Sequence, residues 1–381
     1  MFNRPKNVRH PHSVNPLSSS LTPHDAVPKR WTRLHQLLHD NHGMRYFVMT
    51  LGVVVATGVA VLSIMHLTAE PIPANHSQIA TKKKTPKFYS QLTGAETSED
   101  AAQRPVTAVM IENSPEARPQ SGLKDAGVVY ETVAEGGITR FVALYQESRP
   151  GLIGPVRSVR PYYVEWASAY DPAVAHIGGS QRALSMIRSG NYGVDMDEFF
   201  NASTYWRADD RDAPHDVYTT FDKLDALRES KGKTRSSFST FERVNGAPSI
   251  DPNATSIDID VSSGVFHITY DYDASSNSYV RKQGGESHID REGGEIKPSV
   301  VIAIKVPMSI GMEDGYREQI TTTGSGQAYV FQNGTVTEGT WHRDGEKAPL
   351  QITAADNSNI TLVRGQTWIT ALANNRGVSW Q

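Results

Sequence analysis

The sequence predicts a membrane protein with one N-terminal transmembrane helix, an α/β domain over residues 104–239 and a mainly β domain over residues 240–381. Three observations predict this fold class. A long apolar run lies near the N-terminus, strand and helix patterns alternate up to residue 239, and short strand-like runs separated by turn residues follow. The length of 381 residues is enough for about two folded domains.

Composition excludes several classes of protein. The formal net charge is −3, so no global basic field indicates nucleic acid as a partner. The chain contains no cysteine, which excludes disulfides, thiolate metal sites, cysteine nucleophiles and a lipidated cysteine. The folded part must therefore be stabilised by its core alone, and a chain of this length can do so.

Residues 46–67, YFVMTLGVVVATGVAVLSIMHL, contain no Asp, Glu, Lys or Arg. As a helix at 1.5 Å per residue they span about 33 Å, enough for a hydrocarbon core of about 30 Å. A buried soluble helix is the alternative, but such a helix usually has a polar face. We therefore expect residues 46–67 to contact the lipid bilayer.

The flanking charges predict a cytoplasmic N-terminus. Seven basic residues and two acidic residues precede the apolar run, whereas no basic residue follows it before Lys82. A cleaved signal peptide is the rival interpretation. The preceding region of 45 residues and the long apolar run favour an uncleaved anchor. We expect a single-pass protein of the cell membrane whose C-terminal domains are extracytoplasmic.

The segments on either side of the apolar run have linker-like compositions. Residues 1–45 form a basic cytoplasmic tail, in which residues 1–28 look disordered and residues 30–40 form a short amphipathic patch. Residues 68–103 contain prolines, the run Lys82-Lys83-Lys84 and few apolar residues. We expect them to form an extracytoplasmic linker.

From residue 104 to residue 239 the sequence alternates between strand-like and helix-like segments. Ser180 and Thr220 are suited to cap the last two helices. The strand candidates are residues 106–111, 128–133, 138–145 and 173–177, and the helix candidates are residues 158–170, 181–188 and 221–229. This alternation is typical of an α/β domain.

Beyond residue 240 the segments are short and strand-like. Asn333-Gly334 between two apolar runs indicates a hairpin, and Gly284-Gly285 is a further turn signal. The strand candidates are residues 256–261, 265–270, 300–306, 328–332, 359–363 and 366–372. This pattern predicts a mainly β domain.

Residues 104–220 contain ten arginines and one lysine, a strong bias toward arginine. The guanidinium is a planar, permanently charged donor that suits carboxylate and phosphate oxygens. Arg157 and Arg160 precede a predicted helix whose free amides also favour an anion. The alternative is that these arginines pair with the fifteen acidic residues of the same stretch.

Two histidines are candidate site residues. His176 ends a predicted strand, where open α/β sheets bind ligands, and Gly178-Gly179 follow it. His215 lies in a polar loop that also contains Arg207. The alternatives are a core histidine and an ordinary solvated loop. A metal site built from His176, His215, Asp210 and Asp212 lacks a recognisable ligand spacing, so we predict no metal.

Known catalytic and nucleotide-binding signatures are missing. There is no Gly-x-Ser-x-Gly elbow, no Walker loop, no His-Glu-x-x-His and no Gly-x-Gly-x-x-Gly after a strand. We expect no cofactor, and the sequence leaves open whether the protein is an enzyme.

Several longer motifs resemble the YerB-like family of bacterial extracytoplasmic proteins, whose members are often described as lipoproteins. The motifs are residues 104–106, 110–111, 117–123, 129–131, 134–141, 153–160, 176–180 and 213–215, with weaker likeness at 339–341 and 365–369. The resemblance implies two extracytoplasmic domains but no known reaction. This chain departs from the lipoprotein pattern because it has no cysteine to acylate.

Our leading hypothesis is a binding protein for an anionic cell-envelope ligand, such as a polymer phosphate or a peptide carboxylate. The predicted ligand-binding residues are Arg118, Arg140, Arg157, Arg160, His176, Arg207 and His215. One alternative is an envelope hydrolase or transferase that uses His215 or His176 as an acid or base with arginine charge stabilisation. A second alternative is a scaffold for envelope proteins.

Overall fold

The computed structural model describes residues 42–68 and residues 86–381 apart from residue 313. The chain forms two compact units, one within residues 1–83 and one within residues 84–381. Residues 1–41 of the predicted tail (residues 1–45), which include its amphipathic patch, lie outside the described residues. The lysine run at residues 82–84 lies outside them as well.

The first unit contains the helix α2 (His42–Thr68), which includes the apolar run predicted from the sequence. Tyr46–Met65 has a mean hydropathy of 2.4 and is not buried in this unit. Within the described ranges it is the one helix long and apolar enough to cross a membrane. The hydroxyls of Thr50 and Thr57 donate to carbonyls one turn earlier, at 2.7 and 2.8 Å, so these polar atoms are satisfied inside the helix.

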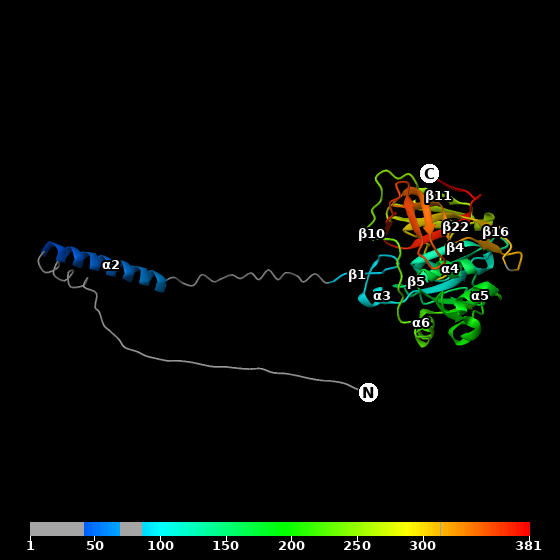
Figure 1. Cartoon of the computed structure of the whole chain (residues 1–381), viewed down its shortest axis with the longest axis horizontal. Helices are drawn as coiled ribbons and strands as arrows, with labels where there is room; N and C mark the ends of the chain where they lie inside the picture. The colour runs from blue at the N-terminus through cyan, green and yellow to red at the C-terminus, as the bar shows by residue number, and fades with distance from the viewer. Residues whose placement is uncertain (1–41, 69–85, 313) are drawn as a thin grey trace, which may run out of the picture. The chain divides into compact units, whose positions relative to one another are not determined.

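The second unit is rich in β-structure and has few helices (Figure 1). Its centre is a mixed ten-stranded sheet. In order across the sheet the strands are β20 (Gln351–Ala354), β19 (Thr335–Arg343), β18 (Gly324–Gln332), β15 (Val300–Val306), β22 (Thr367–Ala373), β4 (Val128–Glu135), β5 (Ile138–Tyr145), β3 (Thr107–Glu112), β6 (Ala173–His176) and β7 (Val194–Asp197).

The sheet runs without a break through both halves of the sequence. Strand β22 lies between β15 and β4 and is parallel to both, with Thr367 opposite Val300 on one side and Val128 on the other. Figure 1 shows the late strand β22 beside the early strand β4. The division into domains at residue 240 stays a prediction, since strands from both sides of residue 240 share this sheet.

A second sheet and four helices surround the central sheet. The second sheet is antiparallel, in the order β14 (Glu286–Ser287), β13 (Ser278–Gln283), β12 (Ile268–Asp273), β11 (Ser256–Ile259) and β23 (Val378–Trp380). The helices are α3 (Glu99–Gln103), α4 (Pro161–Ser168), α5 (Gln181–Arg188) and α6 (Phe221–Ser230).

The remaining elements are short. Four strand pairs are β1 (Phe88–Tyr89) with β2 (Glu96–Thr97), β8 (Trp206–Arg207) with β9 (Val217–Tyr218), β10 (Arg243–Val244) with β21 (Leu362–Val363), and β16 (Met308–Ile310) with β17 (Glu318–Ile320). The 3₁₀ turns are η1 (Pro115–Ala117), η2 (Leu123–Asp125), η3 (Glu198–Phe200), η4 (Ala202–Thr204) and η5 (Gly264–Phe266).

The central sheet is covered on both faces. Helices α4 and α5 pack on one face through Tyr163, Trp166 and Ile187, which belong to the same core as Met110 and Val142. On the opposite face, α6 packs against the end of the sheet that contains β3 and β6. The five-stranded sheet covers the same face at β15, β18 and β22. Burial on both faces explains why β3 is apolar almost throughout.

Most of the predicted segments form the expected elements. Strand β5 and helix α5 have the predicted bounds, and Ser180 and Thr220 cap their helices through Ala183 N and Lys223 N. Helix α4 begins only at Pro161, because residues before it are extended and Val159 pairs with Gly179. The stronger statement that residues 104–239 form a separate α/β domain stays a prediction.

Two segments differ from expectation. Residues 88–103, placed in the linker by composition, contain β1, β2 and α3, and Leu92 is fully buried in the main core. Apolar content there is low, but this one side chain and the hydrogen bond from Ser90 to Gln146 attach the segment. Residues 264–266 form the 3₁₀ turn η5, and the predicted strand starts instead at Ile268.

Candidate functional site

The carboxyl ends of three parallel strands, β3, β6 and β7, lie at one edge of the central sheet. These strands end at Glu112, His176 and Asp197. The segment 153–160 runs across this edge, where Val156 bridges to Ile111 and Val159 to Gly179. Several predicted site residues are therefore brought to the edge where ligands bind in open α/β sheets.

Arg157 and His215 meet at Glu112. Arg157 Nε lies 3.1 Å from one carboxylate oxygen of Glu112, and His215 Nδ1 lies 3.0 Å from the other. The same His215 nitrogen lies 3.2 Å from Ser114 Oγ. A serine relay needs the serine and the carboxylate on opposite ring nitrogens. This arrangement does not supply it, and the hydrolase alternative stays a prediction.

Arg140 and Arg160 meet at Glu135. Arg140 Nη2 donates to Glu135 at 2.9 Å and its Nη1 donates to the Ser158 carbonyl at 2.8 Å. Arg160 donates to Glu135 through Nε at 3.0 Å and also through Nη2. Burial opposes ionisation of Glu135, but the two guanidinium groups prevail and hold its pKa at about 2. Both guanidinium groups therefore have Glu135 as an internal carboxylate partner, which they share with Arg317 Nε at 3.2 Å.

His176 belongs to another polar group. Its Nδ1 lies 2.9 Å from the Gly178 carbonyl and its Nε2 lies 2.9 Å from Asp195 Oδ1. With Asp197, these residues are the one group of three potential metal ligands in the described part of the chain. Arg188 already pairs with Asp197 at 3.0 Å, so the carboxylates have a cationic partner.

Arg207 also has an internal partner, because its Nη1 lies 2.7 Å from Asp216 Oδ1. The metal set considered from the sequence is divided between two places. His176 lies with Asp195, whereas His215, Asp210 and Asp212 line a separate hollow of about 500 Å³. Arg118 lines the same hollow as His215, so these two predicted residues share one surface.

Arg118 differs from the other predicted arginines because it has no carboxylate within ion-pair distance among the described residues. Its Nε donates to Asn113 Oδ1 at 3.3 Å, Nη1 to the Val265 carbonyl at 3.0 Å and Nη2 to the Asn113 carbonyl at 3.0 Å. The guanidinium carbon lies 5.1 Å from the ring centroid of Phe266. Burial and nearby Arg281 lower the pKa of Arg118, and the opposing effect of the Glu131 and Glu116 carboxylates only partly offsets this.

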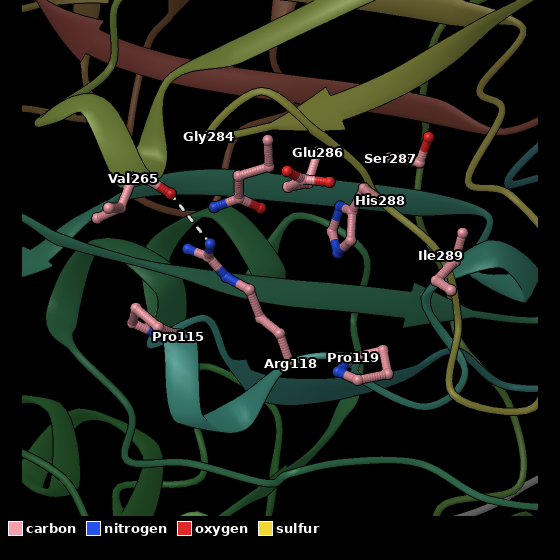
Figure 2. A pocket seen from close by; sticks show the side chains of 10 residues that line it. Pro115, Arg118, Pro119, Val265, Gly284, Glu286, Ser287, His288 and Ile289 are labelled. Carbon is pink, nitrogen blue, oxygen red and sulfur yellow. Dashed lines mark hydrogen bonds between the residues drawn. The ribbon is translucent and has the colours of Figure 1, made fainter.

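Arg118 stands in a groove of about 380 Å³, a size within the usual range for small-ligand sites. One wall comes from residues 115–119 and the other from Val265 and residues 283–289. We call this cavity the Arg118 groove. Figure 2 shows the Arg118 side chain extending from the first wall toward the Val265 carbonyl, opposite Glu286 and His288. Pro115, Pro119, Val265 and Ile289 make the lining largely apolar.

A closed ring of hydrogen bonds lies beneath the groove. Arg281 and Glu131 are fully buried and lie 2.8 Å apart, and the indole of Trp368 also donates to Glu131, at 2.9 Å. The ring runs from Glu131 to Thr139 (3.2 Å), Asn113 (2.6 Å), Gln120 (2.9 Å), His288 (3.0 Å) and Arg281, and back to Glu131. We call these six residues the buried ring.

The buried ring fixes the protonation of His288 and the orientation of Gln283. Nδ1 of His288 accepts from Arg281 and Nε2 donates to Gln120, which is the neutral form of the imidazole. Burial and Arg281 keep the pKa of His288 well below its ordinary value, which agrees with a neutral imidazole. Gln283 Oε1 accepts from Arg281 at 3.0 Å, which leaves its buried Nε2 without a hydrogen-bond partner among the described residues. Gln283 and His288 both line the Arg118 groove.

Comparison with known proteins places both walls of the groove in one family. Residues 92–235 match the family model "Protein of unknown function (DUF3048) N-terminal domain", and residues 257–369 match the corresponding C-terminal domain. A Bacillus subtilis (strain 168) protein named "Putative lipoprotein YerB" is 33% identical over 290 residues, which cover 74% of this chain and 86% of that protein. The chain belongs to the DUF3048 family.

A solved member of the family has the same fold. The crystal structure of the YerB protein from Bacillus subtilis superimposes with a TM-score of 0.69 at 30% sequence identity. The match covers 77% of this chain and all of that chain. In the DUF3048 family models, the wall at residues 115–119 belongs to the N-terminal domain and the wall at residues 283–289 to the C-terminal domain.

The sequence predictions did not include the second wall. Gly284-Gly285 indicates a turn, but nothing local shows that this turn faces Arg118 across the chain. Glu131 and Trp368 lie within motifs that carry the family resemblance, and Gln120 stands in one of them. A charged residue inside the largely apolar strand β4, Glu131, was the available signal of a buried polar network.

Proposed function

We propose that this protein is anchored in the cell membrane by α2 and binds an anionic ligand of the cell envelope in the Arg118 groove. One observation carries the proposal. Arg118 stands in a largely apolar groove, and it has no acidic partner in the described part of the chain, whereas Arg140, Arg157, Arg160 and Arg207 all have one.

The hydrogen bonds of Arg118 leave room for a ligand. A guanidinium has five N–H groups, and three of them donate to oxygens of Asn113 and Val265. One N–H on each terminal nitrogen remains, which is the pair that grips a carboxylate or phosphate in a bidentate contact. The three partners are neutral, so they orient the side chain but do not cancel its charge.

Of the seven predicted ligand-binding residues, Arg118 lines the groove and His215 lines the hollow beside it. The lining of this hollow includes three acidic side chains, and His215 Nδ1 already lies 3.0 Å from Glu112. Glu286 stands on the opposite wall of the groove and is exposed, so water screens it from Arg118. An anion that reaches Arg118 meets a single half-buried positive charge.

The anchor and the family together support the location. The Bacillus relative is named a lipoprotein, which is a protein held at a membrane by lipid. This chain has no cysteine for such a lipid, and α2 supplies a membrane-length apolar helix instead. The basic residues before α2 favour a cytoplasmic N-terminus, with residues 86–381 outside the membrane.

A titration of the full chain in lipid nanodiscs tests the proposal. Soluble anionic fragments of the cell envelope, namely peptide-bearing wall fragments and polyol-phosphate oligomers, are titrated at low and physiological salt. We expect Arg118→Met to weaken binding at least tenfold, because a charge-assisted bidentate contact contributes about 1.5–3 kcal/mol.

Arg207→Met is the matched control, because Arg207 is an exposed arginine of the same region that pairs with Asp216. The Arg207→Met protein is expected to bind the envelope fragments with the affinity of the unaltered protein. Equal affinities for Arg118→Met and the unaltered protein would reject the groove as the binding site.

A further inference from the structure

The hairpin between β13 and β14 leaves backbone groups unpaired at the groove. Gly284 and Gly285 have positive φ angles of 60° and 87° and form a two-residue turn, so Gln283 and Glu286 are the first pair of the ladder. The next pair, Lys282 with Ser287, is then the non-hydrogen-bonded kind. The following bond, from the His288 amide to the Arg281 carbonyl at 3.0 Å, agrees with this alternation.

The N–H and C=O of Ser287 therefore point away from β13. Strand β14 is the outermost strand of the five-stranded sheet. Among the described residues, no hydrogen-bond partner is present for either backbone group of Ser287. Ser287 is exposed and lines the Arg118 groove. At Ser287 the outer edge of this two-residue strand is thus open in one wall of the groove.

We propose that the groove binds an extended peptide that ends in a free carboxylate, with the peptide backbone pairing to Ser287 and the carboxylate pairing to Arg118. This inference rests on the proposed function and names the class of its ligand. It combines two known modes of peptide recognition, the addition of a strand to a sheet edge and the capture of a terminal carboxylate.

Gln283 provides an independent observation that points to a ligand. Its side chain is 4% exposed and lines the groove, and its Nε2 has no acceptor in the described part of the chain. The bond from Arg281 to Oε1 holds the amide so that Nε2 is the free end. A buried donor without an acceptor is costly, and a carbonyl oxygen of a bound peptide would satisfy it.

The lining favours a peptide over a polyanionic polymer. Val265 and Ile289 are 52% and 42% exposed and form, with Pro115 and Pro119, apolar surface suited to side chains of a peptide. A chain of phosphates needs several cations in a row, whereas this groove has Arg118 alone, with Glu286 opposite. A peptide with one terminal negative charge and mainly apolar side chains fits this lining better than a chain of phosphates does.

Three libraries of fluorescein-labelled hexapeptides test the inference on the full chain in nanodiscs, by fluorescence anisotropy. The first library has free C-terminal carboxylates, the second has C-terminal amides, and the third has free carboxylates with an N-methyl group on each of the last two peptide nitrogens. We expect binding of the first library and at least a tenfold loss for each of the others.

Two variants at one position test the backbone contact from the protein side. Ser287→Pro removes the outward N–H but no ladder hydrogen bond, since proline is tolerated on edge strands. Ser287→Ala keeps the N–H and removes only the hydroxyl. We expect at least a tenfold loss for Ser287→Pro and no change for Ser287→Ala, with circular dichroism confirming that both variants fold.

The outcomes separate this inference from the proposed function. Binding that depends on Arg118 but tolerates both N-methylation and Ser287→Pro would overturn the peptide inference and leave the anion site intact. Binding of polyol-phosphate oligomers but of no peptide library would overturn it as well. If Ser287→Pro fails to fold, the N-methylated library decides by itself.

Discussion

At the scale of single residues, the buried ring links the two parts of the sequence. Glu131, Thr139, Asn113 and Gln120 come from the first half, and Arg281 and His288 come from the second. A buried ion pair gives little net stability, but removal of one partner leaves an uncompensated charge. We therefore regard the ring as a fixed support that positions Gln283 and the second wall of the groove.

Glu135 provides a pH-dependent test of the arginine pairing. Its folded pKa of about 2 is below the ordinary value of 4.5, so the unfolded chain binds the proton more readily. The stabilisation is complete above pH 4.5 and is lost as the pH falls toward 2. We expect Glu135→Gln to lower the free energy of unfolding by about 3 kcal/mol at pH 7 and by almost nothing at pH 2.

Urea denaturation at several pH values, followed by tryptophan fluorescence, measures this difference. Glu338→Gln is a suitable control, because Glu338 has no ion pair among the described residues and lies on a strand of the same sheet. A loss at pH 7 that persists unchanged at pH 2 would show that Glu135 acts through packing and not through its charge.

At the scale of elements, the crossing segment 153–160 depends on glycine. Gly154 has a φ of 151°, and a Cβ there would lie 2.8 Å from the Val217 carbonyl oxygen and 2.7 Å from the Tyr218 ring. We expect Gly154→Ala to lower the free energy of unfolding by about 1–3 kcal/mol, because close-packed backbone cannot yield without cost. Thermal unfolding monitored by circular dichroism checks this.

Gly151→Ala is the matched control three residues earlier, where an added Cβ meets no atom within 4 Å. Its free energy of unfolding is expected to stay within about 0.5 kcal/mol of the unaltered protein. Equal effects of the two substitutions would mean that the crossing segment does not require the close approach at Gly154.

Elements with a local cause were predictable from the sequence. Helix α5 follows from the cap at Ser180 and its spacing, and the hairpin of β18 and β19 follows from Asn333-Gly334. The pairing of β22 with β4 joins residues more than two hundred positions apart, and no local pattern encodes such a partner. The second wall of the groove depends on the same long-range arrangement, so the sequence indicated Arg118 but not Ser287.

The sequence alone also could not predict which arginines pair with which acidic residues. The sequence shows ten arginines and fifteen acidic residues between residues 104 and 220, but not which of them meet. The structure pairs Arg157 with Glu112 and Arg140 with Glu135, and leaves Arg118 with neutral acceptors. Only the three-dimensional contacts distinguish an arginine available to a ligand from one used inside the fold.

At the scale of the whole molecule, the absence of cysteine makes the membrane topology simple to measure. A single cysteine at Ser18 or at Lys231 is treated in intact cells with a membrane-impermeant maleimide. We expect the Lys231→Cys protein to be labelled and the Ser18→Cys protein to be labelled only after lysis. Labelling of Ser18→Cys in intact cells would reverse the proposed orientation.

The central claim is that the Arg118 groove holds an envelope ligand, and photo-crosslinking in living cells tests it most directly. A benzophenone amino acid replaces Ile289 in the groove wall, or the exposed Ile250 outside that wall as a control. We predict a discrete adduct at position 289 that is absent at position 250 and disappears with Arg118→Met. Adducts that are equal at both positions, or that persist with Arg118→Met, would contradict the claim.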